Sequence, residues 1–177
     1  MTVRYRSATE NDIDAIMRIE YESFVPGLRE ERELYLKRIK AFSEGFLVAE
    51  EDETGEIGGY ISSEMWHRDH PIGAETLALG HDPEDVHHPG GTHFYITSFG
   101  TLASWRGKGI GVALFEELER RIAARSPAVE KSILIVSEKW RTAHHIYQKR
   151  GFKEVGRIID FFLPEETPPE DAIIMMK

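Results

Sequence analysis

The stretch 93–111 (HFYITSFGTLASWRGKGIG) constrains this chain most, because a strand-like segment there runs directly into a glycine-dense turn. Residues Phe94–Phe99 are aromatic or β-branched for the most part, which is typical of a buried strand. From Val112 onward the apolar spacing changes to a helical period, with Phe115 and Leu118 on one face. The stretch therefore predicts a strand, a glycine turn and an amphipathic helix, in that order.

A glycine turn at the start of a helix is suited to binding an anion. The first N–H groups of a helix have no partner within it, and the helix dipole makes that end positive. Gly107, Gly109 and Gly111 carry no Cβ, so a phosphate can approach their backbone closely. Arg106 and Lys108 add positive charge beside these glycines. We expect the ligand of this turn to be a pyrophosphate.

The known glycine loops fit this spacing poorly. A nucleotide-binding P-loop requires Ser or Thr after its lysine, whereas Gly109 follows Lys108 here. The dinucleotide fingerprint Gly-x-Gly-x-x-Gly is one residue longer than the spacing of Gly107, Gly109 and Gly111. A helix entry that binds no ligand is the remaining alternative from the residues alone.

Two motifs resemble those of a known family. The segment Arg106–Gly111 (RGKGIG) resembles the Arg/Gln-x-x-Gly-x-Gly/Ala signature of the GNAT superfamily of acyl-CoA N-acyltransferases. The segment Ala143–Phe152 (AHHIYQKRGF) is similar to the late Ala-x-x-x-Tyr-x-x-x-Gly-Phe motif of that family, and the strand-like Ile133–Val136 lies between the two. The resemblance implies one α+β GNAT-like domain over residues 1–177. Its sheet would be mixed but mostly antiparallel, with about seven strands, helices on both faces, and a V-shaped gap between the fourth and fifth strands.

The resemblance also implies that acetyl-CoA, the acetylated form of coenzyme A, is the co-substrate. Residues Phe99, Gly100 and Thr101 would flank its pantetheine arm, and their backbone N–H groups would polarise the thioester carbonyl. The pyrophosphate would lie against a second group of residues: Arg106, Gly107, Lys108, Gly109, Ile110, Gly111 and Val112.

Tyr147 matches the tyrosine of the late motif, which implies that it protonates the departing thiolate. A phenol with a pKa of about 10 is protonated at neutral pH and can donate its proton to a thiolate whose conjugate thiol has a pKa of about 8.5. The alternative is a core ring with an idle hydroxyl. Trp140 stands where the family often has an asparagine that contacts the coenzyme, so that contact is not expected here.

The group that takes a proton from the acceptor amine is not identified by the sequence. Glu64, His93 and Glu138 lie near the ends of predicted strands, and His144 and His145 lie on the last predicted helix. Each is a candidate general base, and water is another.

Apolar periodicity and turn residues divide the rest of the chain. Thr9 resembles a helix N-cap, and Pro26-Gly27 breaks the helix that follows it. The expected strands are Val3–Ala8, Phe46–Glu50, Ile57–Met65, Phe94–Phe99, Ile133–Val136, Phe152–Leu163 and Ala172–Met176, and further helices are expected over Arg29–Phe42, after Val112 and over Trp140–Arg150.

Aromatic residues and one long segment are candidates for the acceptor site. Tyr21, Phe24 and Tyr35 in the first two helices either shape an acceptor pocket or belong to the core. Residues 66–91 are rich in Pro, Gly and His, so we expect an irregular, helix-free segment that folds over the site as a lid. Its histidines lack the spacing of ligand pairs, so no metal site is expected.

Composition excludes several functions. The 177 residues suit one domain, and 31 acidic against 22 basic side chains give a net charge of -9, which disfavours nucleic-acid binding and suits a cationic amine acceptor. There is no cysteine and no signal-like or membrane-spanning run, so a cytoplasmic protein with no membrane partner is expected. The acceptor would be a small-molecule or peptide amine, and unprotected strand edges allow a homodimer. The alternative is a non-catalytic domain that senses acyl-CoA.

Overall fold

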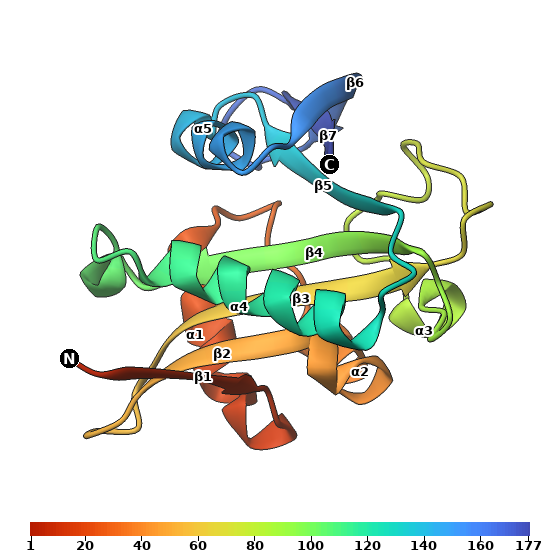
Figure 1. Cartoon of the computed structure of the whole chain (residues 1–177). Helices are drawn as coiled ribbons and strands as arrows, with labels where there is room; N and C mark the ends of the chain where they lie inside the picture. The colour runs from red at the N-terminus through yellow and green to blue at the C-terminus, as the bar shows by residue number, and fades with distance from the viewer.

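A single sheet runs through the structure, a computed structural model that describes residues 1–177 (Figure 1). Its order is β1-β2-β3-β4-β5-β7-β6, and every neighbouring pair is antiparallel except β4 and β5. The seven strands and mostly antiparallel pairing confirm the predicted fold class. The strands are β1 (Val3–Ser7), β2 (Phe46–Glu51), β3 (Ile57–Trp66), β4 (His93–Thr101), β5 (Lys131–Ser137), β6 (Lys153–Phe162) and β7 (Glu170–Met176).

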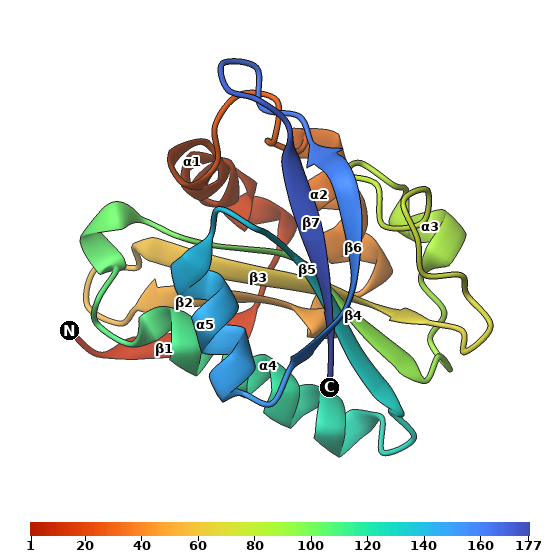
Figure 2. The same cartoon turned by 90° about the horizontal axis from the view of Figure 1, so that it is seen from above.

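Helices cover both faces of this sheet. Figure 2 shows α1 and α2 on one side, and α4 and α5 on the other. The helices are α1 (Ile13–Ser23), α2 (Arg32–Ala41), α3 (Pro83–Val86), α4 (Ile110–Arg125) and α5 (Arg141–Lys149), with short 3-10 turns η1 (Glu10–Asp12), η2 (Ser43–Gly45) and η3 (Ala103–Trp105). None of these helices has the length and apolarity needed to cross a membrane.

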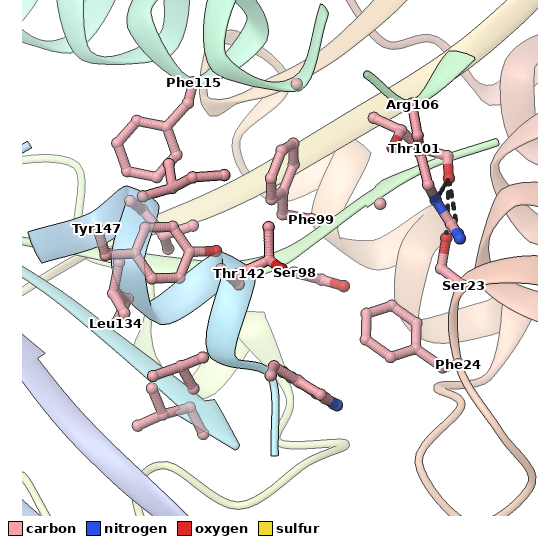
Figure 3. A pocket seen from close by; sticks show the side chains of 18 of the residues that line it. Ser23, Phe24, Ser98, Phe99, Thr101, Arg106, Phe115, Leu134, Thr142 and Tyr147 are labelled. Carbon is pink, nitrogen blue, oxygen red and sulfur yellow. Dashed lines mark hydrogen bonds between the residues drawn. The ribbon is translucent and has the colours of Figure 1, made fainter. Parts of the chain in front are cut away.

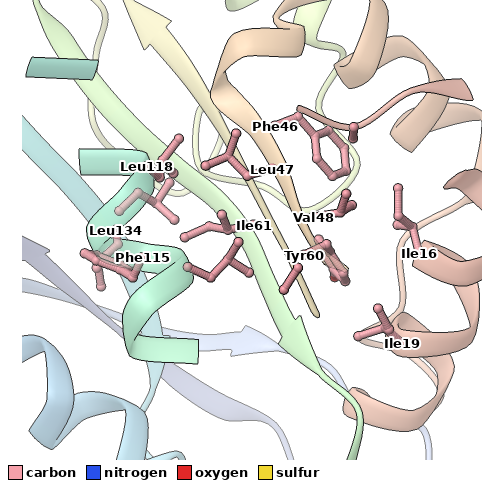
Figure 4. Close-up of a cluster of buried hydrophobic side chains, with 14 of the residues drawn as sticks. Ile16, Ile19, Phe46, Leu47, Val48, Tyr60, Ile61, Phe115, Leu118 and Leu134 are labelled. Carbon is pink, nitrogen blue, oxygen red and sulfur yellow. The ribbon is translucent and has the colours of Figure 1, made fainter. Parts of the chain in front are cut away.

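The core lies between the central strands and the two helical layers. Successive residues of a strand point to opposite faces, so a strand buried on both faces is apolar almost throughout. Phe46 and Val48 of β2 face α1, whereas Leu47 faces α4 (Figure 4). On that second side Phe115 and Leu118 of α4 are almost completely buried, as their helical spacing predicts.

Two expectations for individual elements are wrong. The second helix begins at Arg32 rather than Arg29, because residues 26–28 form a turn and the N–H of Glu30 then donates to the Glu20 side chain of α1 at 2.9 Å. The segment after β3 is not free of helix, since it contains α3. Asp82 explains this single turn: its carboxylate accepts a hydrogen bond from the backbone N–H of Glu84 at 3.0 Å, and Pro83 occupies the first helical position.

Candidate active site

A gap opens in the middle of the sheet. The parallel strands β4 and β5 pair only through His93, Phe94 and Tyr95, and beyond Tyr95 the two strands diverge (Figure 1). A bulge on the other edge of β4 accompanies this divergence: Ser62 pairs with Ser98 and Ser63 with Ile96, so Thr97 is the extra residue. Bulges bend the strand that carries them. The result is the predicted V-shaped gap, with a free main-chain edge along the second half of β4.

The gap is part of a cavity of about 800 Å³. Residues from α1, β4, the glycine loop, α4, β5 and α5 line it. Of the predicted cofactor-binding residues, nine reach this lining: Phe99, Gly100, Thr101, Arg106, Gly107, Gly109, Ile110, Gly111 and Val112. Lys108 is not among the residues that line the cavity, so its predicted contact with the phosphate stays a prediction.

The glycine loop forms a cradle at the start of α4. Gly107 and Gly109 have φ angles of +74° and +76°, in the left-handed region where a side chain costs free energy. Gly109 is the N-cap of α4, so the N–H groups of Ile110 and the residues after it begin the helix without intrahelical acceptors. A Cβ added at either glycine would meet no atom within 4 Å, so the space beside the loop is open. The open space and the positive end of the helix dipole make this cradle suitable for an anionic group such as a phosphate.

Arg106 lies along the cavity wall. Its Nε and Nη2 atoms donate to the carbonyl oxygen of Thr101 at 3.2 and 3.1 Å (Figure 3). The guanidinium thus fastens the end of β4 to the glycine loop, and it still lines the cavity.

Tyr147 stands on the opposite wall, on α5. Its ring is 8% exposed and packs 5.7 Å from the Phe115 ring and 6.2 Å from the Phe152 ring. Figure 3 shows its hydroxyl directed into the cavity, toward Ser98 and Phe99 of β4. Burial raises the pKa of Tyr147, so the phenol holds its proton at neutral pH. The ring therefore belongs to the core while the hydroxyl faces the cavity, and the role of this hydroxyl as a proton donor stays a prediction.

Trp140 forms an aromatic wall with Phe24 and Phe162, and all three line the cavity. The Trp140 ring lies 5.6 Å from that of Phe24 and 5.1 Å from that of Phe162. The indole of Trp140 therefore presents an apolar surface at the position where the family often has a polar asparagine. Of the other aromatic candidates, Tyr35 is completely buried and Tyr21 is 59% exposed, so neither lines the cavity.

None of the five candidate bases lines the cavity. Glu64 is a buried residue of β3, where it accepts a hydrogen bond from Trp66 Nε1 at 2.8 Å and contacts His81. Glu138 pairs with Arg157 at 3.1 Å on the surface. His144 lies 2.8 Å from Glu154. His93 and His145 also lie outside the lining, so the structure brings none of these five to the site.

A different carboxylate reaches the cavity. Glu20 of α1 is 1% exposed yet lines the cavity wall. Its Oε1 atom accepts from the backbone N–H of Glu30 at 2.9 Å, and its Oε2 atom accepts from the Tyr35 hydroxyl at 2.8 Å and from the Tyr60 hydroxyl. Sequence reasoning missed Glu20, although one signal exists: it lies four residues after Ile16, on the apolar stripe of the helix.

The pKa values of Glu20 and its neighbour Glu30 are shifted in opposite directions. Burial raises the pKa of Glu20, and the hydrogen bonds it accepts offset this only in part. Burial would also raise the pKa of Glu30, but the Arg38 guanidinium, 2.6 Å away, holds that pKa below its usual range. Glu30 is therefore a structural anion, whereas Glu20 is a carboxylate whose charged form is disfavoured.

A profile of the Acetyltransferase (GNAT) family matches residues 13–152, which is most of the chain and includes the glycine loop, the gap and Tyr147. The chain belongs to the GNAT family. Its acyl-CoA site is therefore expected where the GNAT loop and gap lie. No curated protein sequence matches this GNAT chain.

Solved structures resemble this GNAT domain over its whole length. The loading GNATL domain of CurA from Lyngbya majuscula is 14% identical, with 99% of this chain and 97% of that chain covered and a TM-score of 0.81. A GphF GNAT-like decarboxylase in complex with isobutyryl-CoA is 18% identical, with 98% and 97% covered and a TM-score of 0.77. Arabidopsis thaliana Naa50 in complex with the bisubstrate analogue CoA-Ac-MVNAL is 20% identical, with 100% and 99% covered and a TM-score of 0.73. These likenesses confirm the GNAT fold.

Proposed function

We propose that this protein transfers the acetyl group of acetyl-CoA to a primary amine of a small molecule or a peptide, by direct attack of the amine on the thioester. The observation that carries the proposal is a single cavity. It joins the glycine loop at the start of α4, the free edge of β4 and the hydroxyl of Tyr147. These are the parts that anion binding, carbonyl polarisation and leaving-group protonation require.

Each part has a separate role. The N–H groups at the start of α4 and the positive end of its dipole hold the pyrophosphate. The main chain from Phe99 to Thr101 flanks the pantetheine, with N–H groups that polarise the thioester carbonyl. The phenol of Tyr147, which is protonated at neutral pH, donates its proton to the departing sulfur.

The other arm of the cavity suits the acceptor. The aromatic wall of Phe24, Trp140 and Phe162 offers apolar surface, and Glu20 lies beside it. The net charge of -9 favours the approach of a cationic amine. Naa50, in a complex that joins coenzyme A to a peptide, supports the peptide class, whereas the aromatic wall suits an amine that carries an apolar group.

A thiol-release assay tests this proposal. Wild-type protein with acetyl-CoA is screened against polyamines, aminoglycosides, amino acids and peptide N-termini, and thiol release must depend on the amine. With the acceptor found, Tyr147→Phe should lower kcat by about a hundredfold while calorimetric affinity for acetyl-CoA is kept. Tyr5→Phe on β1, remote from the cavity, is the matched control.

The same assay separates the alternative function. A sensor of acyl-CoA binds acetyl-CoA in the calorimeter but releases no thiol with any amine in the screen. That outcome would replace the transferase proposal with the non-catalytic one. Thiol release that needs no amine would equally contradict N-acetylation.

A further inference from the structure

One buried carboxylate has no cation to balance it. Five carboxyl side chains are buried: Asp12, Glu20, Glu30, Glu50 and Glu64. Four of them have a basic side chain within 4 Å, in the pairs Arg6–Asp12, Arg38–Glu30, Arg6–Glu50 and His81–Glu64. Glu20 accepts only from neutral donors, namely two tyrosine hydroxyls and one backbone N–H. An uncompensated buried charge is costly, so its presence on the wall of an active-site cavity calls for a role.

Hydroxyl groups connect Glu20 to the reacting edge of β4. The Tyr60 hydroxyl donates to Glu20 and lies 2.9 Å from Oγ of Ser98. The Tyr35 hydroxyl, also bonded to Glu20, lies 3.0 Å from the same Oγ. Ser98 lines the cavity directly after the bulge residue Thr97, and it is next to Phe99, where the pantetheine is proposed to end. A continuous chain of hydrogen bonds thus runs from the cavity to a buried carboxylate.

We propose that Glu20 is the proton acceptor for the amine substrate, reached through the hydroxyls of Ser98 and Tyr60. This inference rests on the proposed acetyl transfer and names the group that the transfer requires but that the sequence does not identify. Ser98 is the member that touches the amine. Tyr60 and Glu20 act through Ser98.

The transfer moves two protons away from the nitrogen. A proton passes from the ammonium nitrogen to Oγ of Ser98, while the Ser98 proton passes to Tyr60 and the Tyr60 proton to Glu20. The neutral amine then forms the C–N bond as the C–S bond breaks, and the sulfur takes the proton of Tyr147. The second nitrogen proton leaves to solvent, from which Tyr147 recovers its own. Glu20 releases its proton to solvent when product leaves, so one net proton appears for each acetyl transferred.

The surroundings of Glu20 suit a temporary proton acceptor. The titratable and charged groups that face it are Tyr35 and Arg38 from α2, Tyr60 from β3, and Glu30 from the loop before α2. Arg38 is engaged by Glu30 through two hydrogen bonds of 2.6 and 3.0 Å. The negative charge of Glu30 and burial both raise the pKa of Glu20, so protonation of Glu20 is favoured over that of an exposed carboxylate.

The test is a pH–rate profile of the full-length protein with acetyl-CoA and the acceptor found in the amine screen. Glu20→Gln should lower kcat/KM about a hundredfold at pH 7. The kcat/KM of this variant should then rise about tenfold per pH unit up to the pKa of the amine, about 10. The reason is that the variant must use the neutral amine that is already present in solution. Near that pH the deficit should shrink to a few-fold. Ser98→Ala should show the same rescue, and Asp14→Asn, an exposed carboxylate on the same helix, should match wild type.

The outcomes separate this inference from the proposed function. Acetyl-CoA affinity and thermal unfolding of each variant establish that it is folded, and Ser98→Ala leaves the bonds of Glu20 to both tyrosines in place. A Glu20→Gln protein with the rate and profile of wild type, or a loss that is equal at every pH, overturns the relay while acetyl transfer stands. Absence of amine-dependent thiol release by wild type overturns both.

Discussion

At the level of single residues, two glycines share a backbone conformation but differ in place. Gly109 has a φ of +76° in the cradle, and Gly55 has a φ of +72° in the hairpin between β2 and β3. Neither would bring a Cβ within 4 Å of another atom. A substitution at either position therefore carries the same conformational strain, but only Gly109 borders the cavity.

This pair allows strain and binding to be separated. Gly109→Ala and Gly55→Ala should each destabilise the protein by about 1 kcal/mol, as measured by urea unfolding, because alanine disfavours the left-handed region. Only Gly109→Ala should also weaken acetyl-CoA binding, by about tenfold or more in calorimetry, because its methyl group occupies the phosphate approach. Equal affinity in the two variants would remove the pyrophosphate from this loop.

Arg38 and Glu30 form a buried pair whose members are 2% and 8% exposed. Arg38→Met should cost about 3–5 kcal/mol in urea unfolding at pH 7, since it leaves the Glu30 charge buried without a partner. The double variant Arg38→Met/Glu30→Gln should recover most of that loss. If the double variant is as unstable as the single one, the lost packing of the arginine rather than the stranded charge explains the effect.

At the level of elements, the segment between β3 and β4 is fastened rather than free. His81 Nε2 lies 2.8 Å from Glu64 Oε2 on β3, and the Gly80 N–H donates to Glu30 at 3.0 Å. Lys37 of α2 pairs with Asp82 at the start of α3. Of this segment only Leu79 reaches the cavity lining, so its expected role as a lid stays a prediction.

The histidine contact makes this attachment dependent on pH. Burial lowers the pKa of His81, but the hydrogen bond and charge of Glu64 outweigh it, so the pKa lies above its usual value of about 6.5. The stabilisation is complete below about pH 6.5 and is lost as pH rises through the higher pKa of the folded protein. Amide exchange in residues 78–82, corrected for its intrinsic pH dependence, should show less protection at pH 9 than at pH 6. His81→Gln should remove the difference, whereas the exposed His67→Gln should keep it.

Site residues that lie close together in the sequence can be predicted from it, whereas those that come together only in the fold cannot. The glycine cradle and Tyr147 are carried by short local motifs, so the sequence predicts them. The Glu20 network joins α1 to Tyr60 and Ser98, which lie 40 and 78 residues further on, and no periodic pattern encodes such a meeting. Lys108 illustrates a related limit: the sequence places a positive charge in the turn, but the backbone conformation decides which turn residues line the cavity, and Lys108 is not one of them.

At the level of the whole molecule, the sheet consists of two halves that are joined by a short stretch of parallel pairing. β1 to β4 form one half and β5 to β7 the other, and only three residue pairs between β4 and β5 join the two halves. The resemblance predicts a gap between the fourth and fifth strands, and the structure places it beyond Tyr95, next to the bulge of β4. The outer edge of β6 leaves Val155 and Ile159 exposed at 55% and 66%, and association into a homodimer through such an edge stays a prediction.

A ligand that contacts both half-sheets should stabilise the whole molecule. Acetyl-CoA at a hundred times its dissociation constant adds about 2.7 kcal/mol to the free energy of unfolding. For a domain of this size that should raise Tm by about 5–10 °C in a thermal scan. Pantetheine at the same concentration lacks the pyrophosphate and should raise it much less. Equal shifts with both compounds would contradict the cradle as the principal anchor.

The free edge of β4 affects how the sequences of proteins with this fold can diverge. Contacts made by main-chain amides do not depend on which side chains surround them, so mutation can replace the neighbours of such a groove while the groove persists. The same architecture recurs in solved structures that are only 14% and 20% identical to this chain. Evolution is then free to rework the opposite, side-chain-built wall, and lineages that keep one donor can acquire new acceptors.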